Sequence, residues 1–158
     1  MEKSIREFIR SPRETLGGFC FLPRLIDKVR LYATGDLPKD YHENLLKEGK
    51  TFDGRFLLFT GVSPEALRNV ILKSKTDEEV LSWILKNSQA KTEREIREWV
   101  DTIRKDRPDA DRSRARKSFY PEVAKKWDVA RLSPFDLIDL DEGRIDHPID
   151  GEMKQSRP

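Results

Sequence analysis

SPRETLGGFCFLPRLIDKVR, residues 11–30, combines the apolar spacing of a helix with two adjacent glycines and a proline. At about 100° per residue, one broad face of a helix over residues 12–34 collects Phe19, Leu22, Leu25, Ile26, Val29, Tyr32 and Ala33. A glycine inside a helix costs about 1 kcal/mol relative to alanine, so Gly17 and Gly18 need a structural or functional reason. The spacing predicts one long helix over residues 12–34, kinked at Pro23.

The opposite side of this predicted helix carries small residues flanked by charged ones. In chain order the stripe consists of Arg13, Gly17, Cys20, Arg24, Asp27 and Lys28. Its small residues would let a ligand approach the backbone, and its basic side chains would donate hydrogen bonds to that ligand. The planar guanidinium of arginine suits a carboxylate or a phosphate. We therefore expect a groove for a small anion, with Arg55 of TFDGRF (residues 51–56) as a further contact.

The glycine pair is also consistent with arrangements that involve no ligand. Gly17 and Gly18 would end a short first helix, with Pro23 beginning a second one and the charged residues forming a solvated face. A second helix of the same chain that crosses closely at the glycines would need the same small residues. In the alternative function, a protein-interaction module or homodimer, the surface of Gly17, Gly18 and Cys20 admits a partner helix.

Helix starts are marked by short polar motifs along the chain. Ser-Pro pairs, which place a capping hydroxyl before a proline suited to the first turn, occur at residues 11–12, 63–64 and 133–134. Capping-box spacing links Ser11 to Glu14, Thr76 to Glu79 and Thr92 to Glu95. These motifs, with no long alternating stretch, predict an all-α fold of about six helices in one domain over residues 1–146.

Three segments are less clearly helical. FDGRFLLFTG (residues 52–61) leaves open a short strand or a helical turn at 55–60, and the lack of an evident second strand favours helix. Residues 104–118 are dense in charge and are expected to form an exposed linker. Residues 147–158 have little apolar content and are expected to be a frayed tail.

The composition of the chain argues against several classes of function. The 158 residues carry a net charge of +2 and one cysteine, so an internal disulfide is excluded and no strong charge favours nucleic acid or a membrane. No apolar run of about eighteen residues occurs, and a cytoplasmic protein is expected. We expect neither a metal nor a cofactor, since the two histidines and Cys20 form no ligand motif. His42 beside Tyr41 offers acid–base chemistry, but an enzyme ranks below the two binding functions.

Several fragments carry a family resemblance. SPRETLGGFCFLPRLIDKVRLYATG, FDGRFLLFTGV, DEEVLSWI and FDLIDLDEGRI resemble a family of small bacterial proteins catalogued only as a domain of unknown function. The resemblance covers residues 11–145, and the Ser-Pro-Arg start, the Gly-Gly pair and the Leu-Ile-Asp-Lys run are its most specific pieces. It implies a compact cytoplasmic domain and brings no established activity, cofactor or catalytic residue.

Overall fold

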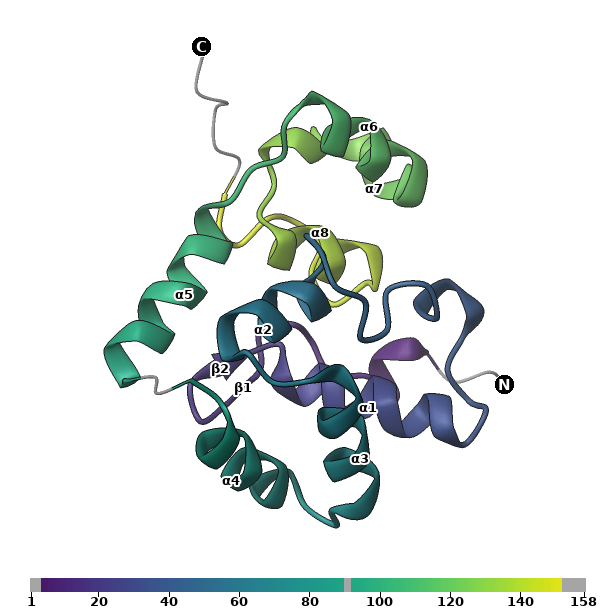
Figure 1. The fold of residues 1–158 in the computed structure, drawn as a ribbon. Coiled ribbons are helices and arrows are strands. Elements are labelled where there is room, and N and C mark those ends of the chain that lie inside the picture. The colour runs from purple at the N-terminus through teal and green to yellow at the C-terminus, as the bar shows by residue number, and fades with distance from the viewer. Residues whose placement is uncertain (1–3, 90–91, 152–158) are drawn as a thin grey trace. The chain divides into compact units, whose positions relative to one another are not determined.

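The computed structural model describes residues 4–89 and 92–151 (Figure 1). Within these residues the fold is mostly helical, which confirms the fold class, with eight α-helices where about six are predicted. The α-helices are α1 (Leu22–Ala33), α2 (Phe52–Thr60), α3 (Pro64–Lys73), α4 (Asp77–Asn87), α5 (Glu93–Lys105), α6 (Ala110–Phe119), α7 (Pro121–Lys126) and α8 (Pro134–Asp141). Three short 3-10 helices add η1 (Ile5–Glu7), η2 (Lys39–Tyr41) and η3 (Val129–Arg131).

The long helix predicted for residues 12–34 is wrong over residues 12–21. Two short strands, β1 (Thr15–Leu16) and β2 (Phe19–Cys20), pair antiparallel there. Gly17 and Gly18 form the two-residue turn between them, with φ of +58° and +85°. Adjacent glycines suit this hairpin turn because both central residues need positive φ. The helix begins only at Leu22, with Pro23 in its first turn, so the alternative of a helix starting at Pro23 is close to the structure.

Most of the predicted helix starts are confirmed. Ser63 and Ser133 cap α3 and α8, and Thr76 caps α4, each through a hydroxyl that accepts a backbone N–H. Thr92 and Glu95 form a reciprocal capping box at α5. The segment at residues 55–60 is helical, within α2. Ser11 begins no helix: the chain turns after it and enters β1 instead.

The chain divides into two compact units, residues 1–97 and 98–158, each with its own buried apolar residues. In the first unit the rings of Phe19 and Phe56 meet edge to face at 5.5 Å. The fully buried aliphatic side chains there are Ile9, Leu22, Leu25, Ile26, Leu67, Ile71, Val80 and Ile84. In the second unit Val123, Val129, Leu132 and Leu137 form the core.

Two expectations about the polar segments need correction. The linker predicted for residues 104–118 contains helix α6, whose buried positions are Ser113 and Arg116 rather than apolar residues. Hydrophobic periodicity cannot detect a helix that buries polar side chains. The tail predicted from residue 147 is bound at residues 149 and 150, whose amides donate to the Asp136 carboxylate at 2.9 Å. Residues 152–158 of that tail lie outside the described residues.

Gly17 packs against α4, and an alanine there tests the contact. A Cβ on Gly17 would lie 2.6 Å from Leu81 Cδ1, whereas a Cβ on Gly35, which also has positive φ, would meet nothing within 4 Å. Backbone strain costs about 1 kcal/mol at both sites, and the crowding raises the loss at Gly17 to about 2 kcal/mol. Urea unfolding of Gly17→Ala and Gly35→Ala measures both losses. Equal losses would show that the contact with Leu81 is unimportant.

Candidate functional site

Two of the predicted anion ligands are buried on α1, one turn apart. Arg24 is 3% exposed and Lys28 is 5% exposed, although a helix face of this charge is normally solvated. Lys28 Nζ donates to Asp53 Oδ1 at 2.8 Å. Asp53 is 1% exposed, so this is a buried ion pair. A charge taken out of water costs several kcal/mol before its partner offsets it.

Asp53 reaches this position because it lies in the first turn of α2. Thr51 caps that helix by accepting a hydrogen bond from the Gly54 amide at 3.1 Å. A carboxylate near a helix N-terminus is favoured by the helix dipole. While one oxygen of Asp53 accepts from Lys28, the other accepts from the Leu46 amide at 2.6 Å. One carboxylate therefore joins α1, α2 and the segment between them.

Backbone strain is concentrated beside this ion pair. Among the described residues, the non-glycine residues with positive φ are Phe21 (+71°) and Leu46 (+52°). Leu46 donates its amide to Asp53. The Phe21 ring lies 5.2 Å from Lys28 Nζ and stacks on Phe52 at 4.9 Å. Left-handed conformations of large residues are costly and concentrate at functional sites. The two strained residues therefore make the Lys28–Asp53 pair a candidate site.

Arg24 faces the segment between α1 and α2 from the same helix. Its Nη1 donates to the Arg10 carbonyl at 3.0 Å, and its guanidinium carbon lies 5.7 Å from the centre of the Tyr41 ring. Tyr41 ends η2 and is half-buried. Each buried cation of α1 thus contacts a group from another segment: Arg24 contacts the Tyr41 ring, and Lys28 contacts the Asp53 carboxylate.

Asp27 has a structural partner that the sequence did not reveal. Arg10 donates its backbone amide, Nε and Nη2 to the Asp27 carboxylate at 2.9–3.0 Å, and its Nη1 to Asp77 at 2.7 Å. Burial lowers the pKa of Arg10, but the hydrogen bonds with Asp77 and Asp27 outweigh it and raise the pKa above the ordinary value. Arg10 therefore clamps the N-terminal segment to α1 and α4, with Asp27 as part of the clamp.

The remaining predicted residues occupy different places. Arg55 is half-buried on α2 and its Nε donates to the Lys50 carbonyl at 3.3 Å, close to the Asp53 turn. Arg13 lies in the turn before β1, where its amide donates to Ser11 Oγ. Cys20 is buried within the hairpin. Because Cys20 is buried and Gly17 packs on α4, contacts within the chain account for the small residues of the stripe.

His42 is exposed on the segment between α1 and α2. Its Nε2 lies 2.6 Å from the Leu37 carbonyl oxygen, so this nitrogen carries the proton and donates. Its ring meets Tyr32 edge to face at 5.0 Å. These contacts hold His42 against the end of α1.

The second unit contains a separate arginine cluster. Arg116 Nη1 donates to the carbonyls of Val129 and Leu132 at 2.7 and 3.0 Å. Burial and the neighbouring Arg112 lower the pKa of Arg116 to about 10, which leaves it charged at neutral pH. Arg107 Nε donates to the Arg131 carbonyl at 2.9 Å. These guanidiniums bind carbonyls of η3 and of Leu132 after it, and so hold η3 against α6 and the segment before α6.

These features define a mostly helical protein with a hairpin before its first α-helix and a buried charged site on that helix. The chain belongs to the family described as Domain of unknown function (DUF5069), whose model matches residues 6–144. This match confirms the family resemblance. No curated protein matches the chain significantly. In the described part of the chain, no helix is long and apolar enough to cross a bilayer, and His, Cys, Asp and Glu form no group suited to a metal ion.

Proposed function

We propose that this protein binds a small anion, a carboxylate or a phosphate, at Arg24 and Lys28 of α1. The observation that carries the proposal is the burial of two cations one turn apart on one helix. A turn separates their Cβ atoms by roughly 6 Å, so the two head groups can converge on one oxyanion. A stable fold does not need this arrangement, since apolar residues of similar size are often as stabilising as a buried ion pair.

The chemistry of the two head groups supports the same ligand class. A guanidinium and an ammonium each carry several N–H donors, and both bind oxyanions strongly. Aromatic rings adjoin both cations, Phe21 at Lys28 and Tyr41 at Arg24. An apolar surrounding strengthens the attraction between a cation and an anion, because the local dielectric constant is lower than that of water.

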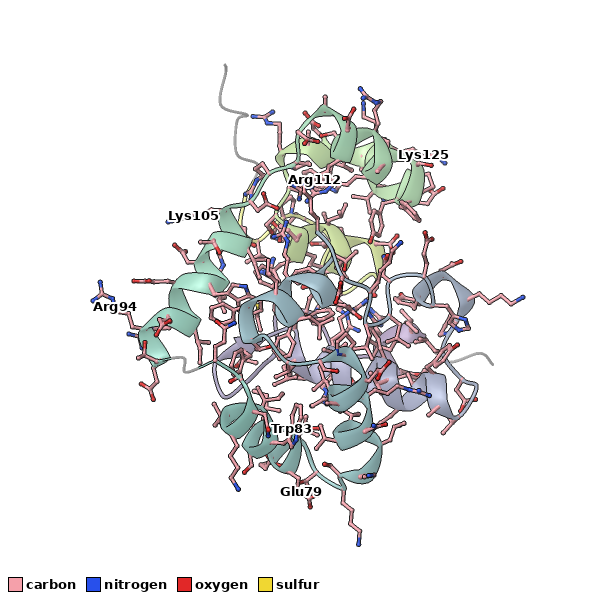
Figure 2. All side chains as sticks on the ribbon, in the orientation of Figure 1. Glu79, Trp83, Arg94, Lys105, Arg112 and Lys125 are labelled. Carbon is pink, nitrogen blue, oxygen red and sulfur yellow. The ribbon has the colours of Figure 1, made fainter. Side chains whose placement is uncertain are left out.

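Thermal unfolding in phosphate, acetate and chloride at equal ionic strength tests the proposal. A ligand present at about 100 times its dissociation constant adds about 2.7 kcal/mol of stability, which moves the midpoint by several degrees. We expect phosphate or acetate to raise the thermal midpoint of the wild type more than chloride does. This difference is expected to disappear in Arg24→Gln. Arg94→Gln is the matched control, because Arg94 points away from α5 into solvent (Figure 2).

Each outcome decides the proposal. A phosphate or acetate shift retained by Arg94→Gln and lost by Arg24→Gln supports the site on α1. Equal shifts in all three proteins would place the anion elsewhere, and no shift above chloride in the wild type would refute anion binding in the tested classes.

A further inference from the structure

The segment between α1 and α2 contacts Arg24 and the carboxylate that binds Lys28. Residues 36–50 contain η2 and turns, and most of their side chains are exposed. The segment reaches the site at Tyr41, whose ring faces Arg24, and at Leu46, whose amide binds Asp53. Its inner side thus contacts charged groups of the site while its outer side faces solvent.

An Asp-Gly pair in the first turn of α2 fastens one end of this segment. Asp53 binds Lys28 with one oxygen and the Leu46 amide with the other. Gly54 makes room for the backbone of Gly49, since a Cβ on Gly54 would lie 2.2 Å from the Gly49 carbonyl oxygen. Both members of the pair are therefore needed: the carboxylate holds the segment, and the missing side chain lets it approach the helix.

The other end has the properties of a pivot. Gly35 follows the C-cap residue Thr34 of α1 with φ of +79°, and a Cβ built there meets no heavy atom within 4 Å. Leu46, near the fastened end, has a φ of +52° that large residues rarely adopt. Its hydrogen bond to Asp53 opposes relaxation of this strain. A segment that alternates between two conformations needs such ends: an uncrowded glycine that can rotate, and a strained residue that one hydrogen bond holds in place.

We propose that residues 36–48 form a lid that opens and closes over Arg24 and Lys28, with Asp53 as its latch. The inference rests on the proposed function, since it gives the lid control over anion entry to that site. In the closed form the Asp53 carboxylate holds Lys28 and the Leu46 amide together. Opening breaks the contact with Leu46, relieves its left-handed backbone and uncovers the Arg24 guanidinium for the incoming anion.

Limited digestion with trypsin measures opening of the lid, because Lys39 and Lys47 lie within it. Cleavage requires a segment to leave its packed position, so its rate follows the open population. Asp53→Asn removes the charge of the latch and is expected to raise cleavage in the lid by about tenfold or more. Asp40→Asn makes the same change on the exposed part of the lid and is expected to leave cleavage after Lys47 unaltered. Cleavage after Arg68, on α3 of the same unit as the lid, reports general loosening.

Inorganic phosphate separates this inference from the proposed function. Faster lid digestion in Asp53→Asn, together with slower lid digestion of the wild type in phosphate, supports both. Faster digestion without any phosphate protection supports the lid and counts against the anion site. Unchanged lid digestion in Asp53→Asn, or an acceleration shared by Arg68, overturns the lid.

Amide hydrogen exchange of the wild type gives a second test that needs no variant. Exchange through local opening is insensitive to low denaturant concentrations, whereas exchange through global unfolding accelerates with denaturant. We expect the Leu46 amide to exchange by local opening, and the amide of Leu67, in the core of α3, to exchange by global unfolding. A Leu46 amide that exchanges with the same denaturant dependence as Leu67 overturns the lid.

Discussion

Lys28→Met is expected to lower the free energy of unfolding by about 3 kcal/mol, because it leaves the Asp53 carboxylate buried without its cation. The two side chains are 6% and 2% exposed and meet at 2.8 Å, so water cannot replace the lost ammonium in the closed structure. For a chain of this length the loss lowers the thermal midpoint by roughly 6–12 °C. Lys47→Met is the matched control: its pair with Glu43 is exposed, and its loss costs within about 0.5 kcal/mol.

A double-mutant cycle separates the ion pair from simple packing. Asp53→Asn retains a side-chain oxygen for the Leu46 amide but leaves Lys28 buried without its carboxylate. The double variant Lys28→Met with Asp53→Asn buries neither charge, so we expect it to be less destabilised than the sum of the two single variants by about 2 kcal/mol. Chemical denaturation of the four proteins measures this coupling. Strictly additive losses would contradict a direct Lys28–Asp53 interaction.

Gly54→Ala is expected to destabilise the protein, although a glycine-to-alanine change inside a helix usually stabilises it. Helix propensity alone would stabilise the protein by about 1 kcal/mol. In this structure the new Cβ would lie 2.2 and 2.5 Å from the carbonyl oxygen and amide nitrogen of Gly49, and backbone atoms cannot rotate away as a side chain can. We expect a net loss of about 2–3 kcal/mol.

Urea unfolding and exchange of the Leu46 amide together measure the effect of Gly54→Ala. The expected result is a destabilised protein in which Leu46 exchanges faster, because the segment after it is pushed away from α2. A gain in stability with unchanged Leu46 exchange would contradict the close approach of Gly49.

Most helices could be predicted from local signals in the sequence. The pairing of the two strands and the burial of polar side chains could not. Ser63, Thr76 and Ser133 cap their helices through contacts within one turn, so sequence spacing alone identifies them. The strands around Gly17 are two residues long, too short for an alternating pattern to distinguish them from a helix. Helix α6 was missed because it buries an arginine and a serine.

In the candidate site, too, the sequence predicted what neighbouring residues determine and missed the contacts between distant ones. The stripe on α1 identified Arg24 and Lys28 as residues that share one side of the helix. Their neighbours come from other segments of the chain, such as Tyr41 at Arg24 and Asp53 at Lys28, which meet α1 only in the folded protein. Asp53, the partner of Lys28, is 25 positions away in sequence. Arg10, which binds Asp27, lies outside the helix that the spacing predicted. No periodicity connects such positions.

The most direct test of the anion site is a titration of ¹⁵N-labelled protein with inorganic phosphate, followed by its amide resonances. Binding at Arg24 and Lys28 under the lid is expected to shift the amides of Lys28, Leu46 and Gly54 together along one saturable curve. The amide of Asp77, in the Arg10 clamp, is expected to shift little. Saturable shifts confined to α6 and α7, or shifts that grow linearly with phosphate everywhere, would contradict a binding site on α1.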